Sequence, residues 1–345
     1  MTHFCRLVLA ALLGLASLTA RAGVGLATLP GVAGDNPVTV FYPTAEADRP
    51  LQRGPFALSL AEDAKPARGN GRLVVISHGS GGMPWVHSDL ARTLVQAGFV
   101  VAVPQHRGDN AMDPGTPGPE SWKRRPAEVS HAIDAVARAP AFAPLLALDR
   151  VGVYGMSAGG HTALSLAGGR WSPARFARHC EAHIADDFPF CVGLLAALHG
   201  DRFDGLKKKT AAFVIRHRFD DAAWQAHDDP RVQAVVAAVP AAADFDPASL
   251  VTPRVPLAFV TAGRDKWLAP ALHAGAILQA CLPRCTLLAD LPGAGHGAFL
   301  SPPPPLERLD AISADLLGDP PGFDRTQLRA VDQSIASFFL RHLGL

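Results

Sequence analysis

The stretch VYGMSAGGHTA, residues Val153–Ala163, places Ser157 between two glycines, Gly155 and Gly159. An apolar run precedes the serine, and the helix-like run HTALSLA follows it. This G-x-S-x-G pattern is typical of a sharp turn from a strand into a helix that exposes the serine hydroxyl. Glycines are needed there because a Cβ would collide with the neighbouring strand or helix. The same five-residue pattern also occurs in ordinary strand-to-helix turns, so only the rest of the chain can show whether Ser157 is a nucleophile.

Seven segments are predicted to be strands, because most are continuous apolar runs that end at turn residues. Alternation of such strands with helices predicts a mostly parallel sheet flanked by helices, in which ligands bind at the carboxyl ends of the strands. The predicted strands are 38–42, 73–77, 99–103, 150–154, 232–239, 257–261 and 286–288. The predicted helices are 86–96, 127–139, 162–167, 271–280 and 326–342.

One part of the chain breaks this alternation. Residues from Gly169 to about Pro230 contain no clear strand that continues the sheet. Connections in compact domains are usually much shorter. We therefore predict an insertion at about 170–230, after the helix that follows Ser157. It either caps the site around the serine or lies on its rim.

Two further residues could activate Ser157. A serine hydroxyl is a weak nucleophile, so acyl transfer needs a base to take its proton and an acid to orient that base. Asp265 follows the strand LAFVTA, and His296 lies in the loop PGAGHGAFL after the strand TLLADL. The order Ser157, Asp265, His296 is that of α/β-hydrolases. Three other carboxylates near strand ends remain alternative acids: Asp244, Asp246 and Asp290.

The loop VVISHGSGG, residues 74–82, could stabilise a reaction intermediate. Acyl transfer passes through a tetrahedral oxyanion, which two backbone N–H groups typically hold, each contributing about 3 kcal/mol. The glycines of this loop allow its backbone to point inward. We predict that the backbone N–H groups of Ser80 and Ala158 form this oxyanion hole. A phosphate-binding loop is disfavoured, because no lysine follows the glycines.

Five stretches across roughly Arg72–Leu300 resemble the α/β-hydrolase group that contains dienelactone hydrolases, cutinase-like polyesterases and platelet-activating-factor acetylhydrolases. They are SHGSGG, DLARTLVQAGFVVAVPQHRGDN, DRVGVYGMSAGG, TAGRDKWLAP and GAGHGAFL. The resemblance implies an α/β-hydrolase fold, with oxyanion donors at Ser80 and Ala158. Two departures limit it. In the acetylhydrolases the acid follows the strand after the nucleophile helix, but Val239 and Pro240 occupy that position here, so Asp265 takes the role as in the polyesterases. In addition, serine stands where dienelactone hydrolases have a cysteine nucleophile.

The first 22 residues are typical of a cleaved secretory signal. Arg6 precedes the apolar run 7–18, and Ala20 and Ala22 form an A-x-A pattern. The run is shorter than the about 20 apolar residues that span a bilayer. We predict cleavage after Ala22, a secreted or periplasmic location, no transmembrane span, and one hydrolase domain over residues 23–345.

Four cysteines follow the predicted cleavage point, and an even number in an exported chain favours disulfides. Three pairings are possible, and closeness in sequence favours Cys180 with Cys191 and Cys281 with Cys285. Zinc at CLPRC is disfavoured, because no histidine or second cysteine pair is near. We expect no metal and no organic cofactor. A net charge of +1 and a single run of three lysines give no footprint for nucleic acid.

These patterns together predict an exported serine hydrolase that cleaves carboxylic esters through an acyl-enzyme. The expected substrate is a small-molecule, lipid or polyester ester. Amide or thioester hydrolysis would use the same residues. The alternative from another class is a catalytically inactive binding protein on the same fold. The sequence makes no prediction of the oligomeric state.

Overall fold

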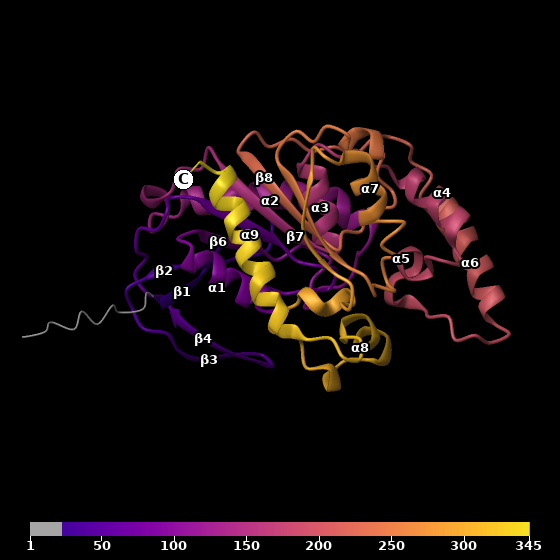
Figure 1. Cartoon of the computed structure of the whole chain (residues 1–345), viewed down its shortest axis with the longest axis horizontal. Coiled ribbons are helices and arrows are strands. Elements are labelled where there is room, and N and C mark those ends of the chain that lie inside the picture. Colours follow the sequence, from indigo (N-terminus) through magenta and orange to yellow (C-terminus); the bar gives the residue numbers. More distant parts are fainter. Residues whose placement is uncertain (1–22, 345) are drawn as a thin grey trace, which may run out of the picture.

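The computed structural model describes residues 23–344 (Figure 1). The predicted signal sequence and its cleavage after Ala22 lie outside the described residues. The described chain forms a ten-stranded sheet in the order β10-β9-β8-β7-β5-β6-β2-β1-β4-β3. Helices cover both faces of this sheet, as predicted. Within the described part of the chain, no helix is long and apolar enough to cross a membrane.

Six neighbouring strands form the parallel part of the sheet. They are β5 (Leu73–Ser77), β6 (Val100–Pro104), β7 (Val151–Met156), β8 (Val232–Ala238), β9 (Leu257–Ala262) and β10 (Thr286–Leu291). Every residue of β5, β6, β7 and β9 is buried. Their uninterrupted apolar sequences are therefore explained by cover on both faces. The predicted mostly parallel sheet is confirmed.

The other four strands complete the sheet with antiparallel pairs and one short parallel contact. They are β1 (Gly23–Leu29), β2 (Val38–Thr44), β3 (Arg49–Arg53) and β4 (Phe56–Glu62). Only β2 was predicted from the sequence. The hairpin of β3 and β4 lies at the edge of the sheet and is largely exposed, so its sequence lacks a buried apolar run. Local hydrophobicity therefore could not reveal it.

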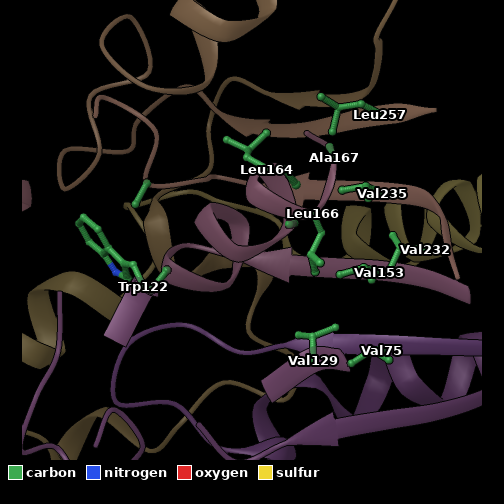
Figure 2. Packing of buried hydrophobic residues seen from close by; sticks show 14 of the residues in the cluster. Val75, Trp122, Val129, Val153, Leu164, Leu166, Ala167, Val232, Val235 and Leu257 are labelled. Atoms are coloured by element: carbon green, nitrogen blue, oxygen red, sulfur yellow. The ribbon is translucent and has the colours of Figure 1, made fainter. Parts of the chain in front are cut away.

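The core consists of two layers, one on each face of the sheet. On one face pack α1 (Ser88–Gln96) and α9 (Leu328–His342). On the other face pack α2 (Pro119–Arg138), α3 (Ala158–Leu166) and α7 (Ala274–Cys281). Figure 2 shows this second layer, with Val129 of α2 and Leu166 of α3 near Val75 and Val153 of the sheet.

Helix α2 is longer than the sequence indicated, since it begins at Pro119 and not at residue 127. The prediction stopped short because Pro126 lies inside the helix, where proline usually breaks the hydrogen-bond ladder. The extra turns are held by tertiary contacts. Trp122 and Arg125 are both buried and face inward from this part of the helix.

Three helices lie between α3 and β8, in the region where the insertion was predicted. They are α4 (Pro173–His183), α5 (Phe188–Val192) and α6 (Asp204–Arg218), and we call residues 173–218 the α4–α6 segment. A disulfide joins Cys180 of α4 to Cys191 of α5, and a second joins Cys281 to Cys285. Both are the predicted pairs. The remaining short helix, α8 (Ala311–Leu317), precedes α9.

Asp332 on α9 makes the stability of the fold depend on pH. Burial and, to a smaller extent, the nearby carboxylate of Asp89 together raise the pKa of this carboxyl group to about 7. An unfolded aspartate titrates near about 4. The folded chain therefore binds an extra proton between these values, and its stability falls as the pH rises through that window.

We expect Asp332→Asn to stabilise the protein at pH 8 by up to about 4 kcal/mol, because a partly buried charge is removed. At pH 4 the folded carboxyl is protonated and the unfolded one is about half protonated, so the gain should be small. Thermal melts of both proteins at the two pH values measure this difference. Equal melting temperatures at pH 8 would contradict it.

Candidate active site

Ser157 sits at the turn between β7 and α3 with a left-handed backbone, φ 59° and ψ −119°. Such angles are strained for a residue with a side chain. The flanking glycines are required by contact distances. A Cβ on Gly155 would lie 1.9 Å from the Gly159 carbonyl oxygen, and one on Gly159 would lie 1.8 Å from the Ser77 carbonyl oxygen. The turn therefore has the strained strand–turn–helix geometry that the G-x-S-x-G pattern indicated.

Ser157, His296 and Asp265 lie in one hydrogen-bonded line. The Ser157 Oγ is 3.0 Å from His296 Nε2, and His296 Nδ1 is 2.7 Å from Asp265 Oδ2. The other carboxylate oxygen of Asp265 accepts the backbone N–H groups of Trp267 and Leu268, each at 2.9 Å. Because an ionised carboxylate only accepts, the proton of His296 belongs on Nδ1. Nε2 is then left free to accept the serine proton.

The sheet brings these residues together. Asp265 follows β9 and His296 begins the short helix His296–Phe299 after β10. Since β7, β9 and β10 are parallel, their carboxyl ends meet at one edge. Both polar side chains are largely buried, with 5% of Asp265 and 4% of His296 exposed. Little water therefore competes for their hydrogen bonds.

The three alternative acids are engaged elsewhere. Asp290 accepts a hydrogen bond from Thr261, and Asp246 caps the short helix Pro247–Leu250. Asp244 is fully buried and its Oδ2 lies 3.1 Å from His161 Nε2. Among residues 23–344, none of the three makes a hydrogen bond to His296. The geometry thus distinguishes Asp265 from them.

The glycine-rich loop after β5 lies against the serine. A Cβ on Gly79 would be 3.4 Å from the Ser157 Cβ. Ala158 is the first residue of α3, so its N–H has no partner within the helix and points from the positive end of the helix dipole. Of the two predicted oxyanion donors, Ala158 directly follows the nucleophile, and Ser80 directly follows the glycine that lies against it.

A buried arginine, which the sequence analysis did not single out, holds this loop. Arg125 is fully buried and donates hydrogen bonds to the carbonyl oxygens of His78 and Gly79, at 2.5 and 3.3 Å. It also donates to Asp109 Oδ2 at 2.9 Å. Asp109 Oδ1 in turn accepts the Ser80 hydroxyl at 2.5 Å and the Gly81 N–H at 3.0 Å.

Arg125 and Asp109 form a buried ion pair in which both side chains stay charged. Burial alone would raise the pKa of Asp109, but Arg125 and the hydrogen bonds from Ser80 and Gly81 hold it below its usual range. Burial likewise lowers the pKa of His78 well below its ordinary value. The loop is therefore fixed by one ion pair and a neutral histidine. Neither has a local sequence signature, because the partners come from the loop after β5, from α2 and from the loop after β6.

A second feature missed by the sequence analysis joins the α4–α6 segment to the site. Asp187 Oδ2 lies 2.6 Å from His179 Nε2 and 3.0 Å from His273 Nε2. His273 Nδ1 accepts the Ala242 N–H, so the His273 proton belongs on Nε2. Burial raises the pKa of Asp187, yet the two histidine bonds bring it below its usual value. His273 lies in the same β9–α7 connection as Asp265.

Comparison with known proteins shows which proteins share this fold. No family model matches the chain, and no curated protein matches it either. A ferulic acid esterase from Streptomyces cinnamoneus is similar in structure, with a TM-score of 0.57 at 17% identity over 95% of this chain and 91% of that chain. The chain has the α/β-hydrolase fold.

A putative dienelactone hydrolase from Klebsiella pneumoniae subsp. pneumoniae is also similar, with a TM-score of 0.49 at 15% identity over 92% of this chain and 98% of that chain. At these identities the likeness concerns the fold alone. The mostly parallel sheet with helices on both faces and the likeness to the ferulic acid esterase confirm the predicted α/β-hydrolase fold. The α4–α6 segment lies between α3 and β8.

Proposed function

We propose that the protein is a serine hydrolase that cleaves carboxylic esters through an acyl-enzyme. The observation that carries this proposal is the line of hydrogen bonds from Ser157 through His296 to Asp265. Nucleophile, base and orienting acid are each within hydrogen-bond reach of the next, as acyl transfer requires. The α/β-hydrolase fold and its likeness to an esterase support the choice of ester.

In the proposed reaction, Ser157 Oγ attacks the ester carbonyl carbon while His296 Nε2 takes its proton. The carbonyl oxygen becomes an oxyanion and accepts the N–H groups of Ser80 and Ala158. When this intermediate collapses, His296 gives the proton to the departing alkoxide, which leaves as an alcohol. Water then attacks the acyl-enzyme with His296 again as base, which releases the acid and restores Ser157. Asp265 stays ionised throughout.

The same proposal includes a secreted or periplasmic location. It is supported by the signal-like sequence before Gly23 and by two disulfides, which form and persist in oxidising compartments. A small-molecule, lipid or polyester ester is the proposed substrate. No step of this chemistry calls for a metal or organic cofactor.

A fluorophosphonate probe tests the nucleophile. We expect one adduct on the peptide that contains Ser157, none in Ser157→Ala, and full labelling in Ser80→Ala, whose hydroxyl takes no part in the covalent step. Mass spectrometry of the digested protein locates the adduct. An adduct on Ser80 would overturn the assignment.

A panel of p-nitrophenyl esters from acetyl to palmitoyl, run beside matched anilides and thioesters, tests the bond that is cleaved. Turnover of esters far above that of anilides is the expected result. Turnover of anilides alone would establish an amidase. Absence of both turnover and adduct would favour the inactive binding protein.

A further inference from the structure

The α4–α6 segment exposes an unusual share of apolar surface. Twelve large hydrophobic side chains are exposed in the described residues, and six of them lie between positions 194 and 214. Four belong to α6 or directly precede it: Phe203, Leu206, Phe213 and Val214, with 51%, 64%, 58% and 49% of their surface exposed. We call these four residues the α6 patch. Several large apolar side chains exposed on one helix are typical of an interaction site.

The patch lies on one side of the helix. At 3.6 residues per turn, its four positions fall within about a quarter of the helix circumference. The opposite side packs on the protein through Ile215, which is buried, and Ala211. Figure 1 shows α6 at the outer edge of the molecule, beyond α4. The patch therefore faces away from the body of the protein and contributes nothing to its core.

Basic residues border the patch on both sides. Between Asp201 and Arg218 the chain has six lysine or arginine residues and two aspartates. The helical spacing puts Lys209 and Arg216 along one edge of the patch and Lys207 and Arg218 along the other. Lys207 pairs with Asp204, and Arg216 makes an exposed contact with Glu181. For Lys209 and Arg218 the described residues provide no ion-pair partner.

We propose that the α6 patch docks on the surface of an anionic lipid bilayer. A helix with an apolar stripe bordered by cations lies in the plane of a membrane interface, with its apolar side among the acyl chains and its cations at lipid phosphates. The flanking positive charge is the observation that selects this occupant. A second copy of the chain would place the same cations opposite each other, which costs binding energy.

This proposal is independent of the proposed function, because binding to a bilayer needs no turnover. It is measured by co-sedimentation of the purified protein with vesicles of phosphatidylglycerol and phosphatidylcholine, and with vesicles of phosphatidylcholine alone. Each cation at an anionic surface contributes about fivefold in partitioning at moderate ionic strength. We therefore expect binding to the anionic vesicles to exceed binding to the neutral ones by at least about tenfold, and to weaken as salt is added.

Two double variants separate the apolar and the charged contributions. Leu206→Gln with Phe213→Gln removes the apolar stripe, and Lys209→Glu with Arg218→Glu reverses charge at both edges. Each should weaken binding to the anionic vesicles by at least about tenfold. The matched control changes two exposed leucines outside the segment, Leu282→Gln with Leu287→Gln, and should bind as the unchanged protein does. All six positions are exposed, so circular dichroism should show an unaltered fold.

The proposal would be overturned if the Leu206→Gln, Phe213→Gln variant bound anionic vesicles as well as the unchanged protein does. It would also be overturned if the unchanged protein bound neutral and anionic vesicles equally. Light scattering provides the remaining test. If the unchanged protein were a dimer and the Leu206→Gln, Phe213→Gln variant a monomer, the α6 patch would be assigned to contact with a second copy of the chain instead. Turnover of p-nitrophenyl acetate should be the same in all these variants, so a failure of vesicle binding leaves the proposed function standing, and the reverse also holds.

Discussion

Asp265→Asn is expected to lower kcat for ester hydrolysis by about 10⁴-fold while the protein stays folded. Asparagine keeps the shape of the side chain, but its amide no longer supplies the charge that fixes the His296 proton on Nδ1. Nε2 would then carry the proton for part of the time and could not accept one from Ser157. Steady-state kinetics with a p-nitrophenyl ester, together with a thermal melt, measure the effect.

Asp290→Asn is the matched control, because it makes the same chemical change near the end of the neighbouring strand. Asp290 bonds to Thr261 and not to His296, so we expect a loss of less than about tenfold. Asp246→Asn keeps an oxygen that can cap the helix Pro247–Leu250 and should behave similarly. Near-normal turnover in Asp265→Asn, with turnover abolished in Asp244→Asn or Asp246→Asn, would move the acid to the loop after β8.

Arg125→Lys is expected to lower kcat by about 10²-fold with KM nearly unchanged. The guanidinium of Arg125 donates at once to His78, Gly79 and Asp109, and a single ammonium cannot reach all of these acceptors. The loop that carries the Ser80 N–H would then lose its orientation. An oxyanion donor acts on the transition state, and its loss costs kcat by about 10² to 10³.

The choice of lysine keeps a positive charge beside Asp109. Arg125→Met would leave that carboxylate buried and unpaired, which costs about 3–5 kcal/mol of stability and could unfold the protein. The control is Arg231→Lys, at an arginine that pairs with Asp229 and Asp134 outside the site. Its kcat should be unchanged. A folded Arg125→Lys protein with unchanged kcat would show that Arg125 serves only the fold.

The parts of the fold and site that could be predicted depend on residues near one another in the chain. The glycines around Ser157 mark the turn, because the collision they avoid involves the adjacent strand and helix. Asp265 and His296 could be selected because each follows its own apolar strand, and parallel strands end at one edge. The predicted strands of the parallel sheet agree with the structure to within a few residues for the same reason.

The parts that could not be predicted depend on contacts between distant segments. Arg125 is 47 residues from His78 in sequence, and neither position signals the other. His273 and Asp187 are separated by 86 residues. Helix α2 passes through Pro126 only because buried side chains on its first turns offset the local cost of proline. Side-chain packing, and not hydrophobic periodicity, decides such cases.

The α4–α6 segment has two parts of unequal local stability, because the carboxylate of Asp187 anchors α4 and α5 to the body of the protein but not α6. Separating α4 and α5 from the body would break the buried bond between Asp187 and His273, while the bond between Asp187 and His179 lies within this part of the segment and would persist. The loss of that buried, charge-assisted contact should make the separation of α4 and α5 more costly than a detachment of α6. Helix α6 has one buried residue, Ile215, and no such anchor. Its lowest-cost fluctuation is therefore a local detachment that leaves the Asp265 loop undisturbed.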